Sequence, residues 1–136
     1  MMRLRLDHEL ALLREHFGDV EHIERGGDDW FRLPNYKYPV GWRVGDVAIT
    51  SAPIVFKVGT AYPGGEPYGF YGPAGLNFRG SPPGNPGSGA APPFAGGWQH
   101  FSWAPDGSWA PTADVKSGSN LLVWSRSFAH RLREGA

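Results

Sequence analysis

Apolar residues near the start of the chain recur with the period of an α-helix. One face of this helix is formed by Leu6, Leu10, Leu13 and Phe17. Their spacing predicts an amphipathic helix over residues 5–17, because positions three and four residues apart lie on the same side of a helix. Asp7 near the start suits the helix dipole, and Gly18 can end the helix.

The same period returns near the end of the chain and predicts a second helix. Either Ser117 or Ser119 can cap its start. Its buried stripe is expected to consist of Leu121, Trp124, Phe128 and Leu132. The side that faces solvent is expected to carry Arg126, His130, Arg131 and Arg133.

Short apolar runs separated by turn residues predict strands between the two helices. These runs cover residues 20–24, 30–33, 44–49, 54–58 and 68–71. Prolines predict a loop over residues 34–43, and Pro53 allows only an edge position or a bend. A helix, a meander of about four strands and a second helix favour an antiparallel sheet in a single α+β domain over residues 1–136.

Glycine and proline dominate the stretch that follows the strands. Residues 72–97 hold eight Gly and six Pro, so we expect a long flexible loop over about residues 79–96. The chain has 13 basic and 13 acidic residues, and therefore no basic field that would attract nucleic acid or an anionic membrane. With no apolar run that could span a bilayer and no signal peptide, we expect a cytoplasmic protein.

The chain contains no cysteine. Disulfides, zinc–thiolate sites and thiol nucleophiles are therefore excluded. His8, His16 and His22 lie in or just past the first helix, and no carboxylate cluster accompanies them. We expect these histidines at the surface and predict neither a metal nor another cofactor.

The segment from Trp98 to Trp103 holds the candidate chemistry. In an extended strand Gln99, Phe101 and Trp103 share one face, and Trp98, His100 and Ser102 share the other. Phe101 and Trp103 make the first face the expected core side. His100 and Ser102 then lie side by side at the surface, with Cα atoms roughly 7 Å apart.

The order of several short motifs resembles that of the ubiquitin-conjugating enzyme (E2) family. Tyr62–Pro67 is similar to the Tyr-Pro…Pro-Pro element of that family, Tyr71–Ala74 stands at its Tyr-His-Pro-Asn, and Trp109–Pro111 resembles its Trp-Ser-Pro. More specifically, the chain resembles the bacterial prokaryotic E2 family E, on the segments Tyr38–Trp42, Tyr62–Pro67, Trp98–Ser102 and Trp109–Pro111. The likeness covers most of the chain.

This resemblance implies a UBC/RWD-like fold and a place in a ubiquitin-like conjugation pathway. The implied partners are a ubiquitin-like protein, an E1-like adenylating enzyme and a JAB-type peptidase. Trp98, Tyr62 and Pro63 are the residues expected to contact a partner.

The departures from the family concern the catalytic residues. The family carries its cargo on a cysteine about eight residues before the Trp of Trp-x-Pro, a position that falls here within residues 100–102. Ala74 replaces the Asn that would support an oxyanion, and Gly72 replaces the His of the same motif. A thioester mechanism is therefore impossible for this chain.

Two interpretations remain. In the first, Ser102 carries the ubiquitin-like protein as an oxyester and His100 is the base, while Asp106 or Asp114 either orients that histidine or takes part directly. A backbone N–H of the Gly-rich loop would then replace the missing Asn as oxyanion donor. In the second, the protein is a catalytically inactive E2-like adaptor that binds the ubiquitin-like protein or its E1-like enzyme, with Trp98 and the flexible loop as the contact surface.

Overall fold

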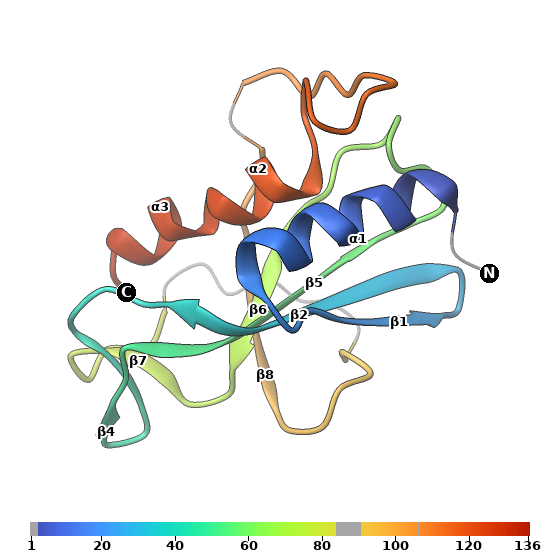
Figure 1. The fold of residues 1–136 in the computed structure, drawn as a ribbon. Coiled ribbons are helices and arrows are strands. Elements are labelled where there is room, and N and C mark those ends of the chain that lie inside the picture. Colours follow the sequence, from blue (N-terminus) through green and yellow to red (C-terminus); the bar gives the residue numbers. More distant parts are fainter. Residues whose placement is uncertain (1–2, 84–90, 106) are drawn as a thin grey trace.

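The computed structural model describes residues 3–83, 91–105 and 107–136. Within these ranges the chain forms two antiparallel sheets with helices near both ends (Figure 1). The helices are α1 (Leu4–Phe17), α2 (Leu121–Arg126) and α3 (Phe128–Arg133). The strands are β1 (Glu21–Arg25), β2 (Asp28–Lys37), β3 (Trp42–Val44), β4 (Val47–Ala48), β5 (Ser51–Val58), β6 (Phe70–Pro73), β7 (Leu76–Phe78) and β8 (Trp98–Phe101).

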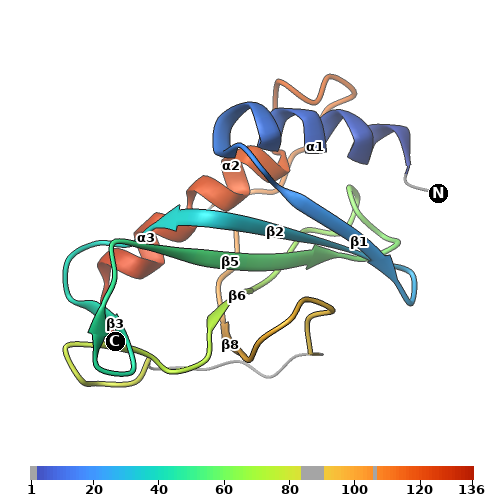
Figure 2. The ribbon, with the colours of Figure 1, turned by 60° about the horizontal axis from the view of Figure 1, so that its bottom comes forward.

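The larger sheet follows chain order, β1-β2-β5-β6-β8, and the smaller sheet has the order β4-β3-β7. Helices α1, α2 and α3 lie on one face of the larger sheet, and residues 91–97, which lead into β8, lie on the other (Figures 1 and 2). The expected α+β class, with an N-terminal helix, antiparallel strands and a C-terminal helix, is confirmed.

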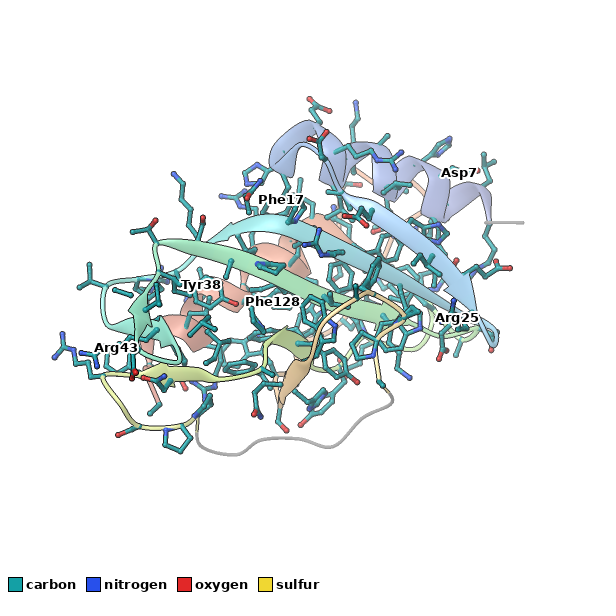
Figure 3. The ribbon with its side chains drawn as sticks, turned by 90° about the horizontal axis from the view of Figure 1, so that it is seen from below. Asp7, Phe17, Arg25, Tyr38, Arg43 and Phe128 are labelled. Carbon is teal, nitrogen blue, oxygen red and sulfur yellow. The ribbon has the colours of Figure 1, made fainter. Side chains whose placement is uncertain are left out.

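The alternation of side chains along the strands divides the interior into two apolar clusters. The main core lies between the larger sheet and the helices, and it contains Phe31, Ile54, Phe56 and Phe70 from the strands. Neighbouring positions on the same strands point to the opposite face, where Trp30, Val55 and Tyr71 pack with Phe94. Figure 3 shows how densely side chains fill both faces of the sheet.

Three stacked rings hold the C-terminal helices on the sheet. The ring of Phe128 lies 4.3 Å from that of Phe70, at an angle of 23° between the planes. Phe70 in turn stacks on Phe101, with centroids 4.8 Å apart and planes only 5° apart. Each ring is at most 1% exposed, so this column joins α3 to β6 and β8 without contact with water.

A buried carboxylate joins α1 to two distant segments. Glu9 is 1% exposed, and its side chain accepts hydrogen bonds from the Tyr62 hydroxyl at 2.5 Å and the Leu121 backbone N–H at 2.6 Å. Arg5, one turn earlier on α1, lies 2.9 Å from the same carboxylate. A buried charge needs such partners, so Glu9 fixes the start of α2 and the Tyr62 loop against α1.

The buried side of the C-terminal helix is the one that its apolar pattern predicts, but its start and its continuity differ from the prediction. The predicted buried stripe of the second helix is confirmed, because Leu121, Trp124, Phe128 and Leu132 are all buried. The cap is neither Ser117 nor Ser119 but Asn120, whose side chain accepts the N–H of Val123 at 2.8 Å. The helix is also interrupted at Ser127, which separates α2 from α3.

Arg131 was expected to face solvent, and this prediction is wrong. Arg131 is 7% exposed, its guanidinium lies 5.3 Å from the ring centre of Phe101, and it donates to the Gly135 carbonyl at 2.7 Å. Attraction between the cation and the ring, together with the carbonyl at the end of the helix, explains how a charged side chain is accommodated there.

The strands between the helices also differ from the expectation. Strand β2 continues to Lys37 through Pro34, because the register shifts between Leu33 and Tyr36 and leaves an irregularity opposite Pro53. The apolar run over residues 44–49 is not one strand, since a turn at Gly45, with φ of +60°, divides it between β3 and β4. The four-stranded meander is therefore replaced by sheets of five and three strands.

The described residues include no helix that is both long and apolar enough to cross a lipid bilayer.

Glu9→Ala should destabilise the protein strongly, because it leaves two buried donors and one guanidinium without their acceptor. We expect the free energy of unfolding to fall by about 3 kcal/mol, measured by urea denaturation. Glu15→Ala, at an exposed position of the same helix, is the matched control and should change stability by less than about 0.5 kcal/mol. Equal urea midpoints for the two variants would show that Glu9 does not hold these segments together.

Candidate functional site

Strand β8 presents the candidate residues at the edge of the larger sheet. It pairs with β6 in a register that sets Phe101 opposite Phe70 and His100 opposite Tyr71. Beyond β8, the N–H of Gly69 donates to the carbonyl of Trp103 at 2.8 Å, so the two chains stay paired past the end of the strand. Phe101 is buried and Trp103 packs against the main core, which confirms the expected core side of this segment.

The ring of His100 is packed between aromatic and backbone groups. It meets the ring of Tyr71 edge-on at 4.8 Å, and its Nδ1 is buried with no hydrogen-bond partner in the described ranges. Burial lowers the pKa of His100, and the positive charge of Lys57 lowers it further. A histidine with a lowered pKa is neutral at neutral pH and is a weaker base than an exposed one.

Gly69 leaves just enough space for this ring. It has a φ of +76°, and a Cβ at this position would collide with Nε2 of His100 and lie 3.1 Å from the carbonyl oxygen of Phe101. Glycine is therefore required here both by the backbone conformation and by the approach of the imidazole.

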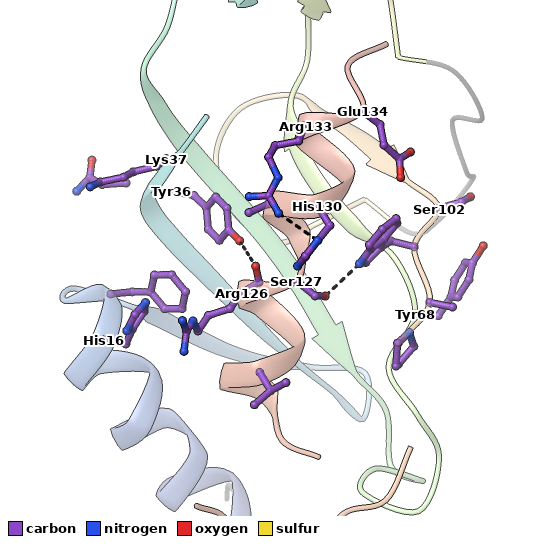
Figure 4. A pocket seen from close by; sticks show the side chains of 17 residues that line it. His16, Tyr36, Lys37, Tyr68, Ser102, Arg126, Ser127, His130, Arg133 and Glu134 are labelled. Carbon is purple, nitrogen blue, oxygen red and sulfur yellow. Dashed lines mark hydrogen bonds between the residues drawn. The ribbon is translucent and has the colours of Figure 1, made fainter. Parts of the chain in front are cut away.

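Ser102 lies at the rim of an open hollow over the outer side of α2 and α3 (Figure 4). The hollow has a volume of about 1400 Å³. Trp103 reaches toward the helices and donates from its indole N–H to Ser127 Oγ at 3.1 Å, while half-buried Ser102 and exposed Tyr68 line the hollow beside it.

The structure brings together only part of the predicted catalytic group. Ser102 lines the hollow, but His100 does not, and no hydrogen bond joins the two side chains in the part of the chain that the structure describes. Asp106 lies outside the described residues. Asp114 is exposed and accepts the N–H of Lys116 at 2.9 Å within its own turn. A catalytic role for Ser102, His100 and Asp106 stays a prediction.

The residues expected to contact a partner lie at different depths. Trp98 is half-buried and packs against the second apolar cluster, with its indole N–H 3.3 Å from the carbonyl of Phe94. Tyr62 is 3% exposed, so its ring belongs to the core. Burial raises the pKa of Tyr62, and the Glu9 carboxylate adds to this effect. Pro63 is half-buried, and partner binding at these residues stays a prediction.

Two of the short motifs are in direct contact. The indole N–H of Trp109 donates to the carbonyl of Pro63 at 2.8 Å, and its ring lies 5.9 Å from that of Tyr62. The Trp-x-Pro and Tyr-Pro elements therefore form one structural unit, although about 45 residues separate them along the chain.

A basic stripe lies in the hollow, and the predicted solvent exposure of its helical residues is confirmed. Arg126, His130 and Arg133 recur at intervals of four and three residues on the exposed side of α2 and α3, and Lys37 lies across from them on β2. Among the described residues, Lys37, Arg126 and Arg133 form no salt bridge with a carboxylate. The helical spacing predicted this exposed side, but the sequence could not show that Glu134 is the one acidic side chain among the described residues that line the hollow.

His130 has a defined hydrogen-bonding state in this stripe. A guanidinium nitrogen of Arg133 lies 3.1 Å from its Nδ1, and a guanidinium can only donate. The neutral ring therefore carries its proton on Nε2.

In the described ranges, no group of three or more His, Asp or Glu side chains is placed to hold a metal ion. Comparison of the chain with known proteins found no matching family model, no matching curated protein and no matching solved structure.

Gly69→Ala should destabilise the protein more than Gly18→Ala. Both glycines have positive φ, at +76° and +87°, but only at Gly69 would the new Cβ meet other atoms. We expect an additional loss of about 1–3 kcal/mol for Gly69→Ala in urea denaturation, because the His100 ring must move. Equal losses for the two variants would mean that the imidazole is not confined by Gly69.

The lowered pKa of His100 should also make stability depend on pH. The unfolded chain takes up a proton at His100 near its usual pKa of 6.5, whereas the folded chain takes it up only at lower pH. The free energy of unfolding should therefore fall as the pH drops below about 6.5. His100→Leu should reduce this fall in urea titrations from neutral to mildly acidic pH, and exposed His8→Gln should not. The same pH dependence in wild type and His100→Leu would contradict the assignment.

Proposed function

We propose that this protein is an E2-like component of a bacterial ubiquitin-like conjugation pathway and that it acts there as a binding adaptor. It would hold a ubiquitin-like protein that an E1-like adenylating enzyme has activated. The observation that supports this most is the position of Ser102 at the rim of an open hollow, within the segment that takes the cargo in the family that the chain resembles. A JAB-type peptidase is the further expected member of the pathway.

The contact between the two short motifs gives independent support. In the family that the chain resembles, the Tyr-Pro and Trp-x-Pro elements lie before and after the segment that carries the cargo. Here Trp109 and Pro63 are joined by a hydrogen bond of 2.8 Å, and Ser102 lies between the two elements along the chain. The motifs thus support the proposal through a shared structural unit as well as through their order.

The environment of His100 favours the adaptor over the enzyme. A serine hydroxyl is a poor nucleophile until a base removes its proton. His100, the candidate base, has a lowered pKa, and its Nδ1 is buried without a hydrogen-bond partner among the described residues. Binding of the ubiquitin-like protein needs neither a base nor a nucleophile.

The exposure of Ser102 to the hollow keeps oxyester formation as a second candidate function. Ser102 Oγ would attack the carbonyl carbon of the C-terminal acyl-adenylate, forming an ester as the bond to AMP breaks. The hydroxyl proton would pass to solvent. Ser102 is half-buried and lines the open hollow, from which such a carbonyl could approach.

Mass spectrometry of a complete reaction should separate these alternatives. The protein is incubated with ATP and with the ubiquitin-like and E1-like proteins encoded beside its gene, and the products are examined by native and denaturing mass spectrometry. We expect a non-covalent complex that dissociates on denaturation and that forms equally with wild type, Ser102→Ala and the exposed control Ser108→Ala.

Two other results would change the conclusion. An adduct that survives thiol reductant, breaks in mild hydroxide and is lost only in Ser102→Ala would establish the oxyester in place of the adaptor. The absence of both a complex and an adduct would exclude the proposed pathway.

A further inference from the structure

We infer that the basic stripe over α2 and α3 is a docking site for an extended acidic peptide segment of a partner protein. The stripe consists of Lys37, Arg126, His130 and Arg133. This inference goes beyond the proposed function, because it depends neither on Ser102 nor on the ubiquitin-like pathway.

The first argument is the imbalance of charge. Three cations line the hollow, and Glu134 is the one acidic side chain among its described lining residues. The whole chain is neutral, with 13 basic and 13 acidic residues, so this local excess is not a consequence of composition. Half-buried Arg32, by contrast, pairs with the Glu21 carboxylate at 2.7 Å. Since Lys37, Arg126 and Arg133 form no salt bridge among the described residues, they are available to an external carboxylate.

The second argument is the spacing of the cations. Arg126 and Arg133 are seven positions apart on almost continuous helix, since Ser127 between them keeps helical backbone angles. A rise of 1.5 Å per residue separates them by about 10 Å along the axis. In an extended peptide of the polyproline II type, which has three residues per turn and a rise of about 3.1 Å per residue, positions i and i+3 lie on the same side, about 9 Å apart. The stripe therefore fits two carboxylates at positions i and i+3.

The space between the two arginines also suits a peptide. His130 lies between them along the helix, and its neutral ring offers an N–H donor at Nε2, which suits a backbone or side-chain carbonyl. Apolar contact is available next to the charges, because Val123 and Tyr68 are each 58% exposed and both line the hollow.

These features favour a peptide over a nucleic acid. Binding of a phosphate backbone relies on many cations spread over a wide surface. Here the cations are few, Glu134 lies among them, and exposed Val123 adjoins them. A peptide can use both the cations and the apolar side chains.

Fluorescence anisotropy with labelled peptides tests this inference at low ionic strength. The first peptide carries Glu-x-x-Glu in a Gly/Ser background with one Leu. The second carries the same two Glu residues side by side, and the third carries Gln-x-x-Gln. We expect the first to bind at least about threefold more tightly than the second, and the third to show no binding.

Variants of the full chain locate the site. Arg126→Glu with Arg133→Glu should weaken binding of the first peptide at least about tenfold, because two attractions become repulsions. The matched control is Arg25→Glu with Arg43→Glu, which makes the same change in net charge at exposed residues on β1 and β3 that do not line the hollow (Figure 3). This control should retain affinity within about twofold.

Several results would overturn the inference. Equal affinity for the three peptides, no binding of any of them, or equal loss in the two double variants would each exclude a docking site at the stripe. Tighter binding of a single-stranded oligonucleotide of the same charge would assign the surface to nucleic acid instead. The experiment contains neither an E1-like enzyme nor a ubiquitin-like protein, so its outcome is independent of the conjugation test.

Discussion

The stacked column of Phe128, Phe70 and Phe101 is the interaction on which the rest of this structure depends. It joins the last helix to two strands that are distant from it in sequence, and all three rings are shielded from water. Offset and near-parallel rings of this kind contribute packing energy beyond the burial of their area. By fixing one side of α3 on the sheet, the column leaves the outer side of α2 and α3, with Arg126 and Arg133, in solvent.

A second constraint is polar and acts at the other end of the helices. Glu9 connects α1 with the Tyr62 loop and the start of α2, and Trp109 connects that loop with the chain after β8. A buried carboxylate is costly unless its acceptor capacity is used, so these segments must be positioned together. The aromatic column and this polar junction together fix the frame within which Ser102 reaches the rim of the hollow.

The absence of cysteine gives the site its chemical character. Without a thiol, the candidate nucleophile is a hydroxyl, which requires more assistance than a thiolate. The one histidine of the segment is held neutral by burial and packed on Tyr71. Its surroundings are therefore better suited to packing than to proton transfer.

The sequence by itself determined which side of a helix or strand is buried. Helical and strand periods identified the buried stripe from Leu121 to Leu132 and the core position of Phe101, because periodicity reports directly which side of an element avoids water. The tertiary structure decided which charges find partners. Arg131 is buried over Phe101 and Glu9 binds Tyr62, whereas Arg126 and Arg133 meet no carboxylate in the described chain. The energy of a charge depends on neighbours brought from distant parts of the chain, and no local pattern contains that information.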